Sequence, residues 1–156
     1  MDNRTADTFG YASVLGHVPA LLSACVEIDR RLAANAFSPR SRALVAMAVA
    51  GRMGDDYCTW VHSRLASHAG LSAEAIFLAA SGTALEARER EMVLLAVRVT
   101  EARRPASGRA RLARPRSLLP EAEEAEVIAQ AVGNITINEL LREAAPASSR
   151  ATPRAH

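Results

Sequence analysis

The chain has 156 residues, of which 49% are hydrophobic, 23% charged and only 4% aromatic, and its formal net charge is +2. This composition is typical of a globular protein, and the small net charge gives no indication of a nucleic-acid partner. The longest apolar run, at residues 43–50, is far shorter than the roughly 20 residues that span a membrane. Because Ala and Leu dominate and strand-like alternation is scarce, we expect an all-α fold with one domain over residues 9–145, between flexible ends at 1–8 and 146–156.

The first expected helices follow from proline and serine positions. Pro19 suits a first helical position, and apolar residues follow it at helical spacing as far as Leu32. Ser38 and Pro39 together predict the N-cap and first turn of a second helix. Gly54 is expected to end that helix, since glycine readily adopts the left-handed conformation of a C-cap.

Two shorter helices are expected next. Asp55 or Asp56 can cap a helix that extends to about Gly70. Ser72 then predicts the cap of a further helix that ends near Ser81.

The last part of the domain contains two longer helices in this interpretation. One covers roughly residues 86–103, and the Arg-rich stretch from Arg103 to Arg116 is expected to be a loop. The final helix starts near Pro120, where acidic residues suit the helix dipole. Residues 132–137 contain glycine and β-branched side chains that suit a strand equally well, and we assign them to the helix from the flanking pattern. In total, we expect a bundle of about six to seven helices.

The two cysteines and the first residues give an expectation for the compartment. Cys25 and Cys58 are too few for a disulfide framework in a chain of this length. Residues 1–9 lack the apolar core of a signal peptide. We therefore expect a cytoplasmic protein that does not associate with membranes.

One group of side chains could carry chemistry. Cys58 and His62 are four residues apart on an expected helix, and Asp55 precedes Cys58 by three, so all three lie on one face. The start of a helix stabilises an anion, and the thiolate is the reactive form of cysteine. The Asp55 carboxylate opposes this effect because it is a like charge. The direction of the Cys58 pKa shift stays open from sequence.

Less reactive interpretations also fit these residues. A buried cysteine in a bundle rich in Ala and Leu is usually a small hydrophobic residue, and Cys25, on an apolar stripe, fits that description. Asp55, Cys58 and His62 offer three donor types that zinc accepts, but three donors from one helix converge poorly on a tetrahedral centre. We therefore expect no metal, and the sequence gives no indication of a cofactor.

An internal repeat is the remaining pattern. Residues 40–49 and 88–97 share the arrangement Arg-x-Arg-x-apolar-Val-x-apolar-Ala-Val. This similarity predicts two related helices.

The motif Tyr57-Cys58-x-x-x-His62 resembles a known family. Together with the upstream pattern at residues 39–49 and the Ala-Gly-Leu-Ser turn at 69–72, it is similar to the core of AhpD-like (carboxymuconolactone decarboxylase-like) proteins. The resemblance implies an AhpD-like helical bundle and a homo-oligomer. It is the main reason to assign this chain a reactive site.

The resemblance also implies residue roles. In redox members of the family, a Cys-x-x-Cys pair reduces a hydroperoxide with help from a His and from a Glu on the preceding helix. Here the second Cys corresponds to Cys58 and the His to His62, but the first Cys falls on Asp55 and the Glu falls on Ala43. This chain is therefore a divergent member in which the motif cannot form a disulfide of its own. If the repeat is real, Glu91 occupies the place of the lost acid.

Three functions follow from these residues. The first is a thiol-dependent peroxidase, in which Cys58 is oxidised to a sulfenic acid that an external thiol reduces, with His62 as base and Asp55, Tyr57 and Glu91 as possible supporting residues. The second is a non-redox carboxymuconolactone decarboxylase-like enzyme that acts on a small acidic metabolite, with His62 as general acid and base. The third is a catalytically degenerate binding or scaffold protein. The resemblance favours the first.

Overall fold

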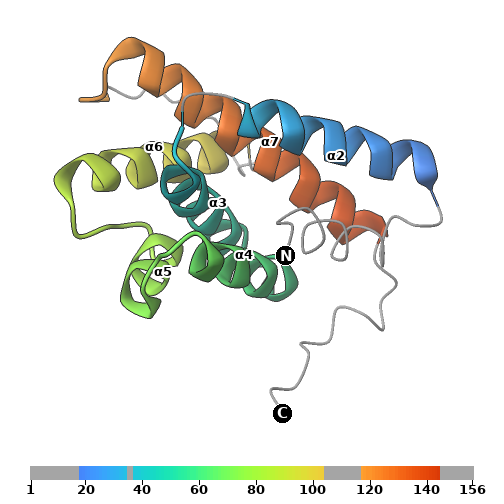
Figure 1. Ribbon diagram of the computed structural model, residues 1–156, viewed down its shortest axis with the longest axis horizontal. Coiled ribbons are helices and arrows are strands. Elements are labelled where there is room, and N and C mark those ends of the chain that lie inside the picture. Colours follow the sequence, from blue (N-terminus) through green and yellow to red (C-terminus); the bar gives the residue numbers. More distant parts are fainter. Residues whose placement is uncertain (1–17, 35–36, 104–116, 145–156) are drawn as a thin grey trace.

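A computed structural model of the chain describes residues 18–34, 37–103 and 117–144 (Figure 1). These ranges contain six α-helices and no strand, which confirms the all-α prediction. The helices are α2 (Pro19–Ala33), α3 (Pro39–Met53), α4 (Asp56–His68), α5 (Ala73–Ala80), α6 (Ala87–Arg103) and α7 (Glu121–Ala144). The ends expected to be flexible, and residues 104–116 of the expected Arg-rich loop, lie outside the described residues.

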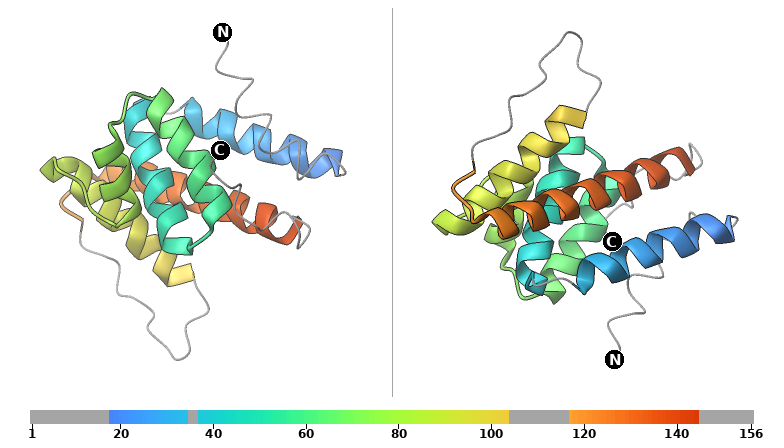
Figure 2. Two further views of the ribbon diagram at one scale, coloured as in Figure 1. Left: turned by 90° about the horizontal axis from the view of Figure 1, so that it is seen from below. Right: turned by 90° about the horizontal axis from the view of Figure 1, so that it is seen from above.

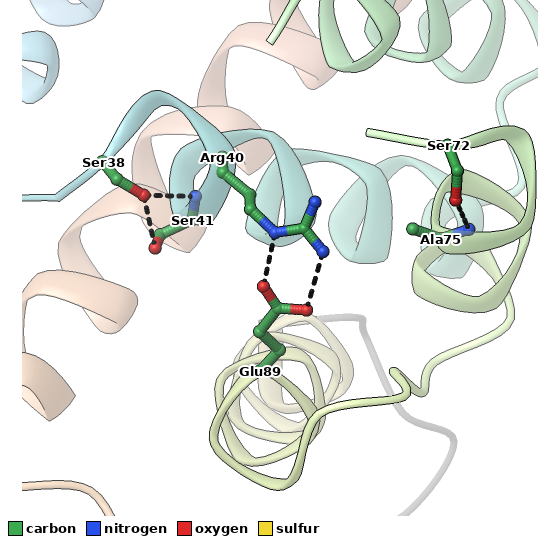
Figure 3. A network of polar contacts seen from close by, with 6 residues as sticks. All are labelled: Ser38, Arg40, Ser41, Ser72, Ala75 and Glu89. Carbon is green, nitrogen blue, oxygen red and sulfur yellow. Dashed lines mark hydrogen bonds and ion pairs between the residues drawn. The ribbon is translucent and has the colours of Figure 1, made fainter. Parts of the chain in front are cut away.

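Side-chain caps set the helix boundaries largely where the sequence predicts them. The Ser38 hydroxyl accepts a hydrogen bond from the Ser41 amide at 3.0 Å, and Ser72 accepts one from the Ala75 amide at 3.2 Å (Figure 3). Each bond satisfies an amide that has no partner within the first helical turn. Gly54 follows α3 with a φ of 69°, a left-handed conformation that strains residues with a Cβ atom.

Helix α7 continues without a break through residues 132–137, which confirms that the ambiguous segment is helical. The physical reason is tertiary packing. Val127, Ala131 and Ile135 are spaced four residues apart, and all three are buried in the main core. This stripe stabilises a helix against the local preference of β-branched residues for strands.

Helix α3 is the central element. It packs against α4, α5, α6 and α7, and every residue from Leu44 to Ala50 is buried. A helix that is apolar on all sides in this way has neighbours on all sides. Gly51 lies where α5 approaches, and a Cβ atom at this position would be 2.2 Å from the carbonyl oxygen of Ala80.

The two segments of the internal repeat are both helical. Residues 40–49 lie in α3 and residues 88–97 lie in α6, and these two helices pack against each other. Arg40 forms two hydrogen bonds to the Glu89 carboxylate, at 2.6 Å and 3.1 Å, across this contact (Figure 3). The pair is partly exposed, so it contributes little to stability.

Helices α2 and α7 run side by side in opposite directions (Figures 1 and 2). A second, smaller apolar cluster forms beside them, and its buried members are Cys25, Ala50, Cys58, Ile137 and Leu141. The cluster thus joins α2, α3, α4 and α7. None of the helices within the described ranges is long and apolar enough to cross a membrane.

Candidate functional site

The start of α4 holds Cys58 in a protonated state. The Asp55 carboxylate caps the helix and accepts a hydrogen bond from the Cys58 amide at 2.9 Å. Burial of the thiol, followed by the negative charge of Asp55 and a hydrogen bond to it, raises the pKa of Cys58 to about 12. At pH 7 only on the order of one thiol in 10⁵ would then be ionised. Burial and Asp55 therefore outweigh the effect of the helix start, which answers the question that the sequence leaves open.

The surroundings of Cys58 are apolar. Its side chain is 2% exposed and belongs to the smaller cluster, which also contains Cys25. Both cysteines are free, and burial raises the pKa of Cys25 as well. These surroundings are typical of an unreactive cysteine.

One turn further along α4, His62 is buried and hydrogen-bonded. Its Nε2 lies 3.4 Å from Oδ1 of Asn138 on α7, while Nδ2 of Asn138 faces the sulfur of Met53 at 3.7 Å. Because an amide oxygen only accepts hydrogen bonds, His62 donates from Nε2 and its lone pair is on Nδ1. Burial lowers the pKa of His62, and the Asn138 bond only partly opposes this. The imidazole is therefore neutral at pH 7.

His62 lines a cavity of about 430 Å³ formed by residues of α2, α3, α4 and α7. Its lining residues are Asp29, Ala33, Pro39, Arg42, Ala43, Ala46, His62, Leu65, His68, Ala69, Gln130 and Asn134. Cys58 is not among them. The structure thus places the candidate base on the cavity and the candidate nucleophile outside its lining.

Arg42 supplies a positive charge to this cavity. Its Nη1 donates hydrogen bonds to the carbonyl oxygens of Phe37 at 2.8 Å and Ala33 at 3.5 Å. Among the described residues, no carboxylate forms an ion pair with it. A guanidinium that carbonyl groups hold in place, with no acidic partner, is suited to bind a carboxylate.

Three buried amide side chains on α7 complete the arrangement. Gln130, Asn134 and Asn138 are spaced four residues apart, so they lie on one face of the helix. Gln130 and Asn134 line the cavity, and Asn138 bonds to His62. No functional role was predicted from sequence for these three residues or for Arg42. The sequence signal for the three amides was their spacing of four residues within an otherwise apolar part of the helix.

The remaining predicted residues lie elsewhere. Tyr57 packs against the smaller cluster, and its ring centroid is 6.4 Å from that of Trp60. Glu91 lines a different cavity, between the starts of α6 and α7, together with Arg88 and Pro120. Over the described part of the chain, no group of three or more His, Cys, Asp and Glu side chains could hold a metal ion.

A comparison with protein families agrees with the resemblance found in the motif. Residues 19–84 match the model of the carboxymuconolactone decarboxylase family. This range covers α2 to α5, and so includes Arg42, Cys58 and His62, whereas α6 and α7 lie beyond it. No match was found among curated proteins or among solved structures.

Proposed function

We propose, for a chain whose residues 19–84 belong to the carboxymuconolactone decarboxylase family, that the cavity binds a small carboxylate metabolite and that His62 acts on it as a general acid and base. The observation that carries the proposal is the neutral, buried His62 on the same cavity as the cationic Arg42. We propose that the reaction is non-redox and that the protein is cytoplasmic. The proposed domain extends over residues 9–145.

The chemistry follows from the charges. Arg42 binds the substrate carboxylate, and Nδ1 of His62 accepts a proton from a substrate carbon next to a carbonyl or carboxyl group. The resulting imidazolium returns the proton to another carbon, which is an isomerisation. In a decarboxylation, an imidazolium that has taken its proton from solvent protonates the carbon that keeps the electron pair when carbon dioxide leaves. A bound anion stabilises the imidazolium, so it offsets the effect of burial on the pKa of His62.

Asn138 is a positioning residue in this mechanism. Its side chain is 1% exposed, and its amide is oriented by Met53 on α3. By accepting the hydrogen bond from Nε2 it fixes the tautomer that leaves Nδ1 unprotonated.

A thiol-dependent peroxidase is the second candidate. The place of Cys58 in the first turn of α4 and the family of residues 19–84 favour it. Its cycle requires a thiolate that attacks the hydroperoxide and an external thiol that reduces the sulfenic acid. The pKa of about 12 and the apolar surroundings of Cys58 give this candidate less support than the acid–base function.

The exposed apolar side chains bear on whether copies of the chain assemble. The described residues include large apolar side chains that are more than two-fifths exposed, among them Trp60 on α4 and Phe77 on α5. We propose that these side chains lie in the interface of a homo-oligomer, the assembly that the family resemblance implies.

The proposed function can be tested without knowing the substrate. A set of small oxo- and unsaturated carboxylates is incubated with the protein in D₂O, and proton NMR detects exchange of carbon-bound hydrogen. We expect exchange with the wild type and with Cys58→Ala, and its loss in His62→Gln. Exchange with none of the carboxylates, or exchange that persists in His62→Gln, would contradict the proposal. Consumption of hydroperoxide by the wild type that stops in Cys58→Ala would favour the peroxidase instead.

A further inference from the structure

Gln130 is a largely buried residue of the cavity lining whose amide bonds to no other described residue. Its side chain is 8% exposed and lines the cavity, and it forms no hydrogen bond with another described residue. The amide atoms themselves are not fully buried, so they can bond to solvent or to a ligand in the cavity. An amide that faces a cavity in this state is suited to a polar group of a ligand.

Asn134 presents a second polar atom to the same cavity. It is 5% exposed, and its Nδ2 donates a hydrogen bond to the backbone carbonyl of Gln130 at 2.8 Å. That bond orients the side chain and leaves Oδ1 as an acceptor. The α7 side of the cavity therefore offers the donors and acceptor of Gln130 and the acceptor of Asn134, and neither residue carries a charge.

We infer that Gln130 and Asn134 recognise a hydroxyl group, and that the ligand is a small hydroxycarboxylate whose carboxylate binds Arg42. This inference rests on the proposed function, since it assumes that the cavity binds a carboxylate. A hydroxyl group both donates and accepts, so it can bond to Nε2 of Gln130 and to Oδ1 of Asn134 together. A second carboxylate fits less well, because the Asn134 oxygen and the Asp29 carboxylate in the cavity lining would both repel it.

Lactate and propionate provide a matched pair of probes, because each has one carboxylate and they differ by one hydroxyl group. Isothermal titration calorimetry gives the dissociation constant of each for the wild type, for Gln130→Met and for Thr136→Val. Methionine is similar to glutamine in size and forms no strong hydrogen bond. Thr136 lies on α7 outside the cavity lining, and its hydroxyl bonds to the Val132 carbonyl, so its substitution is the control.

The wild type and Thr136→Val are expected to bind lactate roughly 2- to 10-fold more tightly than propionate, the range that one net hydrogen bond gives. In Gln130→Met the ratio should fall to about one. Gln130 forms no hydrogen bond with another described residue, so its replacement breaks none. The melting temperature of Gln130→Met should therefore be equal to or higher than that of the wild type.

The outcomes separate the two proposals. If both acids bind equally to the wild type, or if Gln130→Met keeps the preference for lactate, the role of Gln130 is refuted while the carboxylate site stands. If neither acid binds, the carboxylate site and the hydroxyl site are both refuted. A melting temperature several degrees lower in Gln130→Met would show a structural role for this residue and overturn the inference.

Discussion

Replacing Gly51 with alanine tests the packing that holds the site together. A Cβ atom at this position would lie 2.2 Å from the carbonyl oxygen, 2.8 Å from the carbonyl carbon and 2.9 Å from the Cα atom of Ala80. All three contacts are with backbone, so no side-chain rotation relieves them. Helices α3 and α5 would have to separate by about 1 Å or more, since non-bonded carbon atoms pack at about 3.5–4.0 Å.

Two opposing contributions set the size of the effect. Alanine favours a helix interior over glycine by roughly 0.5–1 kcal/mol. Overpacking in a close-packed core costs about 1–3 kcal/mol, and a backbone contact belongs at the upper end. We expect a net loss of about 2 kcal/mol, which for a chain of this size lowers the melting temperature by about 4–8 °C.

Gly133 is the matched control for this prediction. A Cβ atom there would lie 2.5 Å from Cδ1 of Leu32, the end of a flexible side chain on α2. Leu32 can change rotamer, so Gly133→Ala should be nearly neutral. Far-UV circular dichroism during thermal and urea unfolding measures both variants. A Gly51→Ala variant as stable as the wild type, or a Gly133→Ala variant that is the less stable of the two, would refute this reasoning.

The remaining predictions concern the site and the assembly. Asp55→Asn keeps a good helix cap but removes the negative charge, so the pKa of Cys58 should fall and its alkylation by iodoacetamide at pH 9 should become faster; an unchanged rate would contradict the role given to Asp55. The lowered pKa of His62 means that the unfolded chain binds its proton first, so stability should fall as the pH drops below about 6.5. Urea unfolding at pH 5 and pH 8 should show this loss, and it should be smaller in His62→Gln. Light scattering should give a mass above that of one chain, whereas a monomer at all concentrations would argue against an interface that includes Trp60 and Phe77.

The helix positions could be predicted from sequence because interactions between neighbouring residues determine them. Ser38, Ser72 and Asp55 each cap a helix through an amide three residues away, and Gly54 ends a helix by its own conformation. Such signals need only the neighbouring residues. The assignment of residues 132–137 was less direct, because their helical state depends on packing against the core.

The candidate site was harder to predict from sequence, because contacts between residues far apart in the chain form it. The His62–Asn138 bond joins residues 76 positions apart, and nothing near either residue predicts it. The direction of the Cys58 pKa shift depends on burial, which comes from the packing of several helices. Gln130 could not be identified from sequence, because an amide within an apolar segment indicates a binding role only when it is known to line a cavity.

The ionisation of His62, with and without a bound carboxylate, tests the central claim most directly. NMR of ¹⁵N-labelled imidazole gives its pKa in the free protein and in the presence of propionate. The account predicts a pKa below the usual 6.5 in the free protein and a higher pKa with propionate, and correspondingly tighter propionate binding at lower pH. Arg42→Met should abolish this response, while Cys58→Ala should keep it. A His62 pKa that propionate leaves unchanged, or a response that requires Cys58, would contradict the account.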